Sequence, residues 1–330
     1  MVQGSADERP PPRMGKFFYM ADSAHPSLFR NGKVLTRRDR DGTDAEWVGV
    51  DLVEREMPVH DARQLEGSAW PRLDRNGFEL VSQPLQDQNF DFLNNEQVLQ
   101  LYYPQCELAV RGATGARVVA AFDHNVRSAA GKQSKKRIDG GQQVQGPAHV
   151  VHGDYTLTSA PQRLRDLTRP PKANDTLLTI LAAGRSLLDS QEIETAIADG
   201  RYGIVNLWRN IAREPVAVNP LALCDATCVK PEDLVVFEIH YADRIGENYF
   251  ARHATGHRWY FYPGMMRDEA LLIKQWDSAG RMARTKGRTS DPKDGDEPCT
   301  FSFHSAFEDP NASADAPDRW SIEVRCAVVW

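Results

Sequence analysis

Residues 320–330 read WSIEVRCAVVW, a run of β-branched and aromatic residues that predicts a strand. Five further runs of this kind occupy the second half of the chain, each separated from the next by a turn. They are YGIVNLW (202–208), DLVVFEIHYA (233–242), HRWYFYP (257–263), ALLIKQW (270–276) and TFSFHSAF (300–307). Short strands in such a series are typical of a sandwich or a barrel. The sequence therefore predicts an α+β protein that is mainly β.

Helical patterns occur in two places. Between residues 90 and 103 the apolar residues are spaced for a short amphipathic helix, which we expect to end at Pro104. Between residues 157 and 200 the segments SAPQRLRDL and SQEIETAIADG each begin with a capping serine. We therefore expect helices that flank the sheets, including a helical insert at about 157–200.

The domain organisation is expected to be simple. Residues 1–16 are rich in proline and charge and have no apolar period, which predicts a disordered tail. A chain of 330 residues can form one large β-barrel unit, so we expect a single domain over residues 17–330. The polar segment 282–298 is expected to be a loop that covers a site as a lid.

Composition excludes several classes of protein. The formal net charge of -6 argues against a nucleic-acid partner held by phosphate contacts. No run of 18 apolar residues and no secretory signal is present, so no membrane association is expected. The five cysteines are an odd number without dense spacing, which favours a reducing compartment. A cytoplasmic protein, monomeric or homodimeric, is the expectation.

The pair His152 and Asp154 and the remote His304 form the strongest chemical pattern. Two histidines and one carboxylate are the facial-triad ligands of non-haem Fe(II), and this triad leaves positions open for a co-substrate and O2. Residues two apart on a strand lie on the same face, so His152 and Asp154 can reach one ion. His149 is a rival to His152, but it has no carboxylate two residues later.

Arg319 and Ser321 follow the last histidine closely. A guanidinium fork and a hydroxyl can hold the distal carboxylate of an iron-bound 2-oxo dicarboxylate in fixed geometry. Two other patterns favour metal sites less. His253 and His257 are followed by a strand-like run that breaks helical zinc-site spacing, and CDATC at 224–228 has no second ligand pair.

Several motifs, in this order, resemble one known family. They are NGFELVSQP (76–84), TGARVVAAFDHNVR (114–127), VNLWRNI (205–211), GHRWYFYPGM (256–265), HSAFEDP (304–310) and RWSIEVR (319–325). The chain resembles, over roughly residues 45 to 330, the gibberellin desaturase-like and cephalosporin methoxylation-type proteins, which are Fe(II)/2-oxoglutarate oxygenases of secondary metabolism. The resemblance implies a double-stranded β-helix, also called a jelly roll or cupin-like barrel.

The resemblance also implies the co-substrates and the site. Fe(II), 2-oxoglutarate and O2 are expected, with iron on His152, Asp154 and His304 and 2-oxoglutarate on Arg319 and Ser321. Trp320 stands where the family is expected to have an acidic residue. Four further residues are candidates for contacts with substrate or co-substrate: Arg209, Arg258, Tyr260 and Arg325. For Arg209, Arg258 and Tyr260 a plain core role is an equal alternative, and for Arg325 the alternative is a structural ion pair.

The implied reaction is C–H abstraction from a small, carboxylated secondary metabolite. Hydroxylation, desaturation and oxidative ring closure, as in kainoid synthesis, are the outcomes considered. Two alternatives stay open at this point. One is a jelly-roll small-molecule binding protein without catalytic activity, and the other is a metal enzyme that does not use 2-oxoglutarate.

Overall fold

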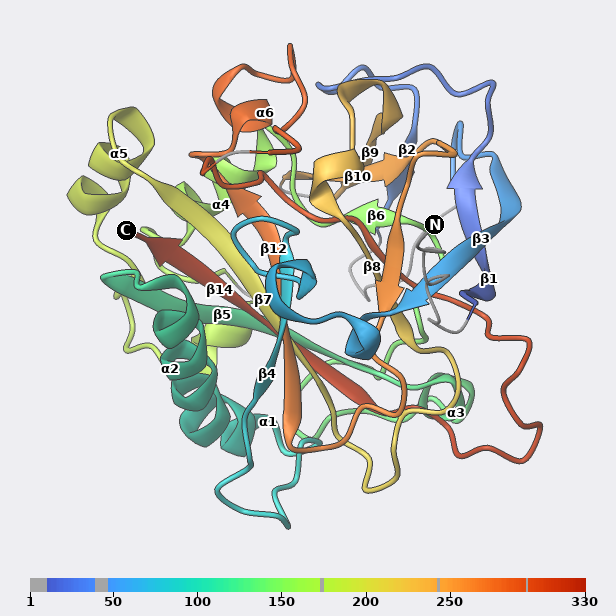
Figure 1. Cartoon of the computed structure of the whole chain (residues 1–330). Coiled ribbons are helices and arrows are strands. Elements are labelled where there is room, and N and C mark those ends of the chain that lie inside the picture. Colours follow the sequence, from blue (N-terminus) through green and yellow to red (C-terminus); the bar gives the residue numbers. More distant parts are fainter. Residues whose placement is uncertain (1–10, 39–46, 173–174, 242–243, 295) are drawn as a thin grey trace.

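The computed structural model describes residues 11–38, 47–172, 175–241, 244–294 and 296–330. These residues form two antiparallel-dominated sheets with few helices (Figure 1). The first sheet has five strands in the order β4 (Phe78–Ser82), β12 (Glu269–Asp277), β7 (Tyr202–Asn210), β14 (Ser321–Val329) and β5 (Val118–Arg127). Its central strands are buried on both faces, and β7 is buried at every position.

The second sheet has nine strands and lies on the other side of the molecule (Figure 1). Its order is β1 (Arg13–Met20), β3 (Leu52–Asp61), β11 (Trp259–Phe261), β8 (Leu221–Cys224), β13 (His304–Ala306), β6 (His152–Gly153), β10 (Ile245–Ala251), β9 (Leu234–His240) and β2 (Leu35–Arg37). The backbone of Phe18 on β1 also bonds to His149 and Val151 beside β6. The sheet therefore curls back toward its own middle strands.

Helices cover the outer face of the five-stranded sheet. A first turn α1 (Asn95–Gln97), a π-helical turn (Val98–Tyr102) and α2 (Tyr103–Thr114) form one continuous helical segment that packs on β5 and β14. The expected helix end at Pro104 is wrong, because the proline occupies the first turn of α2, where its missing N–H is tolerated. Gly115 ends α2 with φ 64°, a left-handed conformation that glycine adopts at little cost.

Short helices occupy the segment in which the helical insert is expected. It contains α4 (Ser159–Asp166), a 3-10 turn (Thr176–Thr179) and α5 (Ser190–Ala198), and α4 packs against α5. The remaining short helices are α3 (Ala129–Gln133), α6 (Arg281–Arg284) and 3-10 turns at Ala62–Gln64, Gly67–Ala69, Ala226–Cys228 and Pro231–Asp233. None of the helices in the described ranges is long and apolar enough to cross a membrane.

The predicted tail boundary needs correction. Residues 1–10 lie outside the described residues, but Arg13 to Lys16 already belong to β1, and Gly15 pairs with Met57. A Cβ on Gly15 would lie 2.6 Å from the ring of Phe307, so the tight packing of this strand depends on glycine. The ordered domain therefore begins before the expected residue 17.

The predicted lid is anchored in this structure. Its first residues form α6, and the buried carboxylate of Asp291 accepts hydrogen bonds from the backbone N–H groups of Met282 and Thr300. Glu297 pairs with Arg281 and Arg284. The role of this segment as a lid stays a prediction.

The strands that the sequence predicts are present in the structure. All six predicted runs contain a strand, namely β7, β9, β11, β12, β13 and β14. Between the sheets, Trp208, Leu223, Leu271 and Ile273 belong to one buried apolar cluster. The expectation of a mainly β protein with flanking helices is confirmed. The cluster fills the space on one side of a group of buried polar side chains.

Candidate metal centre

His152, Asp154 and His304 converge between the two sheets. His152 begins β6, His304 begins β13, and these two residues are directly paired in register. Paired residues on adjacent strands project to the same face, and Asp154, two residues beyond His152, projects there as well. One ligand atom from each residue lies within 4.8 Å of the other two. It is the one such cluster found in the described residues.

The distances suit a single ion. His152 Nε2 lies 3.6 Å from Asp154 Oδ1, and His304 Nε2 lies 4.0 Å from the same oxygen. Two ligands with metal bonds of about 2.1 Å can be separated by at most about 4.2 Å. His152 donates from Nδ1 to the carbonyl of Val150 at 2.7 Å, which leaves the Nε2 lone pair for a metal.

Asp154 presents only one oxygen to this point. Its Oδ2 accepts hydrogen bonds from Asn206 Nδ2 at 2.9 Å and from Arg325 Nε at 3.2 Å. Its backbone N–H donates to Gln275 Oε1 at 3.1 Å. Both the side chain and the backbone of Asp154 are therefore held, and Oδ1 is left to face the histidines.

The protonation states also suit metal binding at neutral pH. Burial lowers the pKa of His152 to about 4, and burial also lowers the pKa of His304. For Asp154, burial alone would raise the pKa, but Arg325 and the two histidines outweigh it and hold the pKa well below its usual range. Neutral imidazoles and an ionised carboxylate are the forms that bind metals.

A small cavity adjoins the three side chains. It is lined by Arg127, Ala148, His152, Trp208, Leu221, His304, Ala306, Arg319 and Glu323. Its volume is about 20 Å³, so a five-carbon dicarboxylate can enter only if a lining side chain turns aside. Two of the lining residues have a buried atom without a hydrogen-bond partner, Arg319 Nε and His304 Nδ1, and so does Ser321 Oγ at the start of β14. Buried polar atoms without partners indicate a ligand or water that would satisfy them.

Two guanidinium groups at this cavity form no direct ion pair with a described residue, and Glu323 is the one acidic residue in the lining. Arg127 donates to the carbonyl of Gly146 and Arg319 to that of Asn219, and among the described residues neither has a carboxylate within 4 Å. Burial and, to a smaller extent, the charge of Arg127 lower the pKa of Arg319 to about 9. Two guanidinium groups beside a single lining carboxylate leave positive charge in the cavity, which a bound anion can balance. The cavity therefore has the electrostatics of an anion site beside the metal cluster.

The other predicted contact residues lie elsewhere or act differently. Arg325 is at the centre, but it holds Asp154, Asp123 and Glu323, which corresponds to its structural alternative. Arg209 points to the outer face of β7. Its three nitrogens donate to the Tyr102 hydroxyl, the Arg267 carbonyl and the Gln83 amide oxygen, so the prediction that it anchors a ligand at this centre is not supported.

Arg258 directly precedes β11 and Tyr260 lies within it, two strands from β13 in the sheet order. Arg258 donates to Asp225 Oδ2 at 2.8 Å and to the Thr227 hydroxyl at 2.7 Å. Tyr260 lies against the ring of Phe78 and is half-buried. Neither residue lines the cavity beside the metal cluster, so the prediction that they contact a ligand there is not supported either.

The sequence-based prediction missed Arg127, Asn206, Gln275 and Glu323. For two of them the sequence contains a feature that indicates an inward-facing polar residue. Glu323 lies between Ser321 and Arg325 in a strand on which alternate residues share a face, and Asn206 is the one polar residue in the apolar run YGIVNLW. Gln275 had none, because a bulge between Lys274 and Trp276 turns it toward Asp154.

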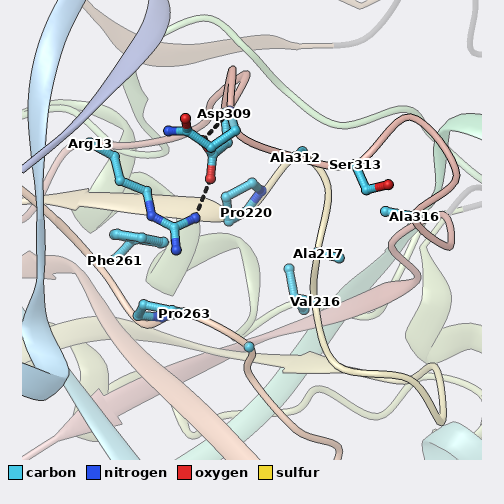
Figure 2. Close-up of a pocket in the computed structure, with 12 residues that line it drawn as sticks. Arg13, Val216, Ala217, Pro220, Phe261, Pro263, Asp309, Ala312, Ser313 and Ala316 are labelled. Carbon is cyan, nitrogen blue, oxygen red and sulfur yellow. Dashed lines mark hydrogen bonds and ion pairs between the residues drawn. The ribbon is translucent and has the colours of Figure 1, made fainter.

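A larger cavity of about 250 Å³ lies outside the metal centre (Figure 2). Val216, Pro220, Phe261 and Ala312 line it, and Arg13 pairs with the buried Asp309 across it. It contains none of the proposed ligands. Size alone therefore does not identify the functional site in this protein.

Known proteins with related sequences and folds agree with this geometry. A hydroxylase/desaturase, poxK of Penicillium oxalicum, is 29% identical over 297 residues, covering 82% of this chain and 78% of that protein. The alpha-ketoglutarate-dependent dioxygenase phiK of a fungal species is 29% identical over 265 residues, covering 78% and 79%. An uncharacterized protein in the dcmA 3' region of Methylophilus leisingeri is 42% identical over 194 residues, covering 58% of this chain and 88% of that protein.

Among solved structures, the iron and alpha-ketoglutarate-dependent endoperoxidase NvfI superposes with a TM-score of 0.66 at 22% identity, covering 96% of this chain and 97% of that one. Fold, relatives and the His-Asp-His cluster define an oxidoreductase of the Fe(II)/2-oxoglutarate oxygenase class. The family model described as "Oxidoreductase/YMDC permease-like domain" matches residues 18–329, so the chain belongs to that family. The expected class of enzyme is confirmed.

Proposed function

We propose that this protein holds Fe(II) on His152, Asp154 and His304, uses 2-oxoglutarate and O2 as co-substrates, and oxidises a small molecule at a C–H bond. The convergence of the three ligand atoms within 4.8 Å carries the proposal. The two guanidinium groups of the adjoining cavity, which form no direct ion pair with a described residue, support it, because 2-oxoglutarate is a dianion.

We assign the fold as a double-stranded β-helix. The metal cluster lies between two facing sheets, and such a barrel holds small ligands in its interior. The overall likeness to NvfI supports this assignment. The neighbouring strands β6 and β13 then serve as the platform for two of the three metal ligands.

When bound, iron supplies the oxidant that removes a hydrogen atom from substrate carbon. The side chains of this protein orient the metal ligands and the co-substrate. Asn206 and Arg325 fix Oδ2 of Asp154, so that Oδ1 binds the metal as a single ligand. Arg319 and Ser321 are proposed to hold the distal carboxylate of 2-oxoglutarate, which their unpartnered buried atoms support, and Arg127 adds a second cation to the cavity. Trp208 and Leu221 exclude water from the cavity.

The substrate is proposed to be a small carboxylated secondary metabolite. Arg127 supports this, since a guanidinium beside the metal can orient a substrate carboxylate when Arg319 is occupied by 2-oxoglutarate. The printed names of relatives include a hydroxylase/desaturase and a dioxygenase, which fit C–H abstraction followed by hydroxylation, desaturation or ring closure. Which product forms depends on where the substrate lies relative to the metal.

Anaerobic titration with Fe(II) and then 2-oxoglutarate tests the proposal. We expect about one Fe(II) per chain and a weak visible charge-transfer band when 2-oxoglutarate is added. His304→Ala should lose the metal, whereas Arg319→Ala should keep it and need much more 2-oxoglutarate to develop the band. Metal binding without a band would favour a metal enzyme that uses no 2-oxoglutarate. Folded protein that binds no iron would favour a non-catalytic binding protein.

A further inference from the structure

Two thiols lie in contact at the end of β8, outside the metal centre. Cys224 is the last residue of β8, Cys228 ends the 3-10 turn Ala226–Cys228, and their sulfur atoms are 3.7 Å apart. All five cysteines lie in the described ranges and are free thiols, and this is the one pair for which a sulfur–sulfur contact is found there. Neither residue takes part in the proposed reaction.

The two thiols have different surroundings. Cys228 receives a hydrogen bond from the backbone N–H of Arg258 at 3.3 Å, and it is 7% exposed. Its pKa is lowered by the hydrogen bond from the Cys224 thiol and, in addition, by that N–H and the charge of Arg258. Cys224 is fully buried, and burial raises its pKa well above the ordinary value. Cys228 is thus the more readily ionised and more accessible thiol, and Cys224 is its buried partner.

No metal site explains the pair. Within the described residues, three potential ligand atoms converge only at His152, Asp154 and His304, and no third ligand side chain joins the two thiols. A purely structural role is also a poor explanation, since a low-pKa thiol beside a second thiol is the arrangement of a redox-sensitive cysteine with its resolving partner.

We propose that Cys224 and Cys228 form a reversible dithiol–disulfide site that hydroperoxides oxidise. The Cys228 thiolate attacks the outer oxygen of the hydroperoxide, the O–O bond breaks, and a sulfenic acid and an alcohol or water are formed. Cys224 then attacks the sulfenic sulfur, the S–S bond forms, and the hydroxyl leaves as water. Two thiols lose two electrons and two protons to one hydroperoxide, so the step is balanced.

The disulfide would lie next to the metal centre. The backbone N–H of Cys224 donates to the Phe303 carbonyl at 2.8 Å, and the Ser302 hydroxyl donates to the Cys224 carbonyl at 2.7 Å. The preceding residue, Leu223, is paired with His304. An S–S bond of about 2.05 Å requires the sulfurs to approach, and these bonds couple β8 to the segment that carries His304. The oxidised protein therefore binds Fe(II) several-fold more weakly than the reduced protein. This effect on iron binding rests on the proposed function.

The test uses the metal-free full-length protein, so the thiol chemistry is measured whether or not the proposed function is correct. The protein is treated with hydrogen peroxide, unfolded, and alkylated with iodoacetamide before mass spectrometry. We expect the number of labels to fall from five to three, a bridge within the peptide that contains both residues, and full recovery with dithiothreitol. Five labels after treatment, or irreversible oxygen addition at Cys228, would overturn the proposal.

Three variants sharpen the experiment. Cys224→Ser removes the resolving thiol, so Cys228 should remain a sulfenic acid that dimedone traps. Cys228→Ser should abolish the bridge. Cys299→Ser is the matched control, because Cys299 is equally buried but burial raises its pKa to about 12, and the bridge should still form. Anaerobic Fe(II) titration of the oxidised and reduced forms then measures the coupling, and equal affinities would overturn that part.

Discussion

Nδ2 of Asn206 lies 2.9 Å from Oδ2 of Asp154 and fixes the oxygen that faces away from the two histidines. Partners of this kind orient metal ligands, and removing one typically costs 10–100-fold in metal affinity. We expect Asn206→Ala to weaken Fe(II) binding by roughly that factor. Anaerobic titration with Fe(II), monitored by a competing chelator, measures the change.

Asn210→Ala is the matched control for this variant. Asn210 lies on the same strand, is equally buried, and donates to the Glu214 and Met265 carbonyls rather than to the metal cluster. It should lower stability without changing metal affinity. If both variants lose affinity equally, the effect belongs to the strand and not to the hydrogen bond.

His304 and His149 provide a second comparison. His304 points at Asp154 with its Nε2, whereas His149 lies outside the cluster and only its backbone carbonyl is bonded to β1. We expect His304→Ala to abolish stoichiometric Fe(II) binding and His149→Ala to retain it. Metal content after anaerobic reconstitution and desalting decides the matter. Loss of iron in His149→Ala alone would assign the site to the rival histidine.

The sequence was sufficient for the strands and for the pair His152 and Asp154, because both are encoded by local periodicity. Residues two apart share a strand face, which placed His152 with Asp154. The pairing of His304 with His152 depends on the order of strands in the sheet, which one sequence does not contain. The resemblance to a family supplied that link.

The prediction for Arg209 is not supported because the sequence does not show which face of its strand points toward the metal centre. Arg209 follows Trp208 by one residue, so the two lie on opposite faces of β7, and a run buried at every position gives no sign of which face is inside. The prediction that the helix ends at Pro104 was wrong. The π-helical turn Val98–Tyr102 leads directly into α2, and Pro104 lies in the first turn of α2, where a proline is tolerated.

The two cations in the cavity, Arg127 and Arg319, are expected to bind different partners. Both guanidinium groups line it, yet only Arg319 belongs to the Arg-x-Ser motif. A charge-assisted hydrogen bond contributes about 1.5–3 kcal/mol, which is roughly 10–100-fold in affinity. We expect Arg319→Ala to raise the 2-oxoglutarate concentration for half-maximal band formation by this factor.

Arg127→Ala is expected to act chiefly on the substrate. It should change 2-oxoglutarate affinity less than Arg319→Ala and leave Fe(II) binding intact, while slowing substrate oxidation relative to succinate release. Arg209→Ala serves as the control, because its guanidinium lies on the outer face of the sheet. An equal loss of 2-oxoglutarate affinity in Arg127→Ala and Arg319→Ala would instead place both cations on the co-substrate.

The buried histidines make the stability of the metal-free protein depend on pH. Burial lowers the pKa of His124 to about 4, while the ordinary value that it regains on unfolding is 6.5. The unfolded state therefore binds a proton that the folded state does not, and stability falls as pH drops from about 6.5 toward 4. At pH 5.5 this single residue should cost roughly 1 kcal/mol relative to pH 7.5.

Urea unfolding of the metal-free protein at pH 7.5 and 5.5 measures this dependence. His124→Gln removes the titrating ring and offers an amide to the Tyr103 hydroxyl, which lies 2.9 Å from Nδ1 of His124. Other groups titrate alike in both proteins, so their contribution cancels in the comparison. The wild type should lose about 1 kcal/mol more than the variant between the two pH values. Equal losses would mean that His124 titrates normally in the folded protein, despite its burial on β5.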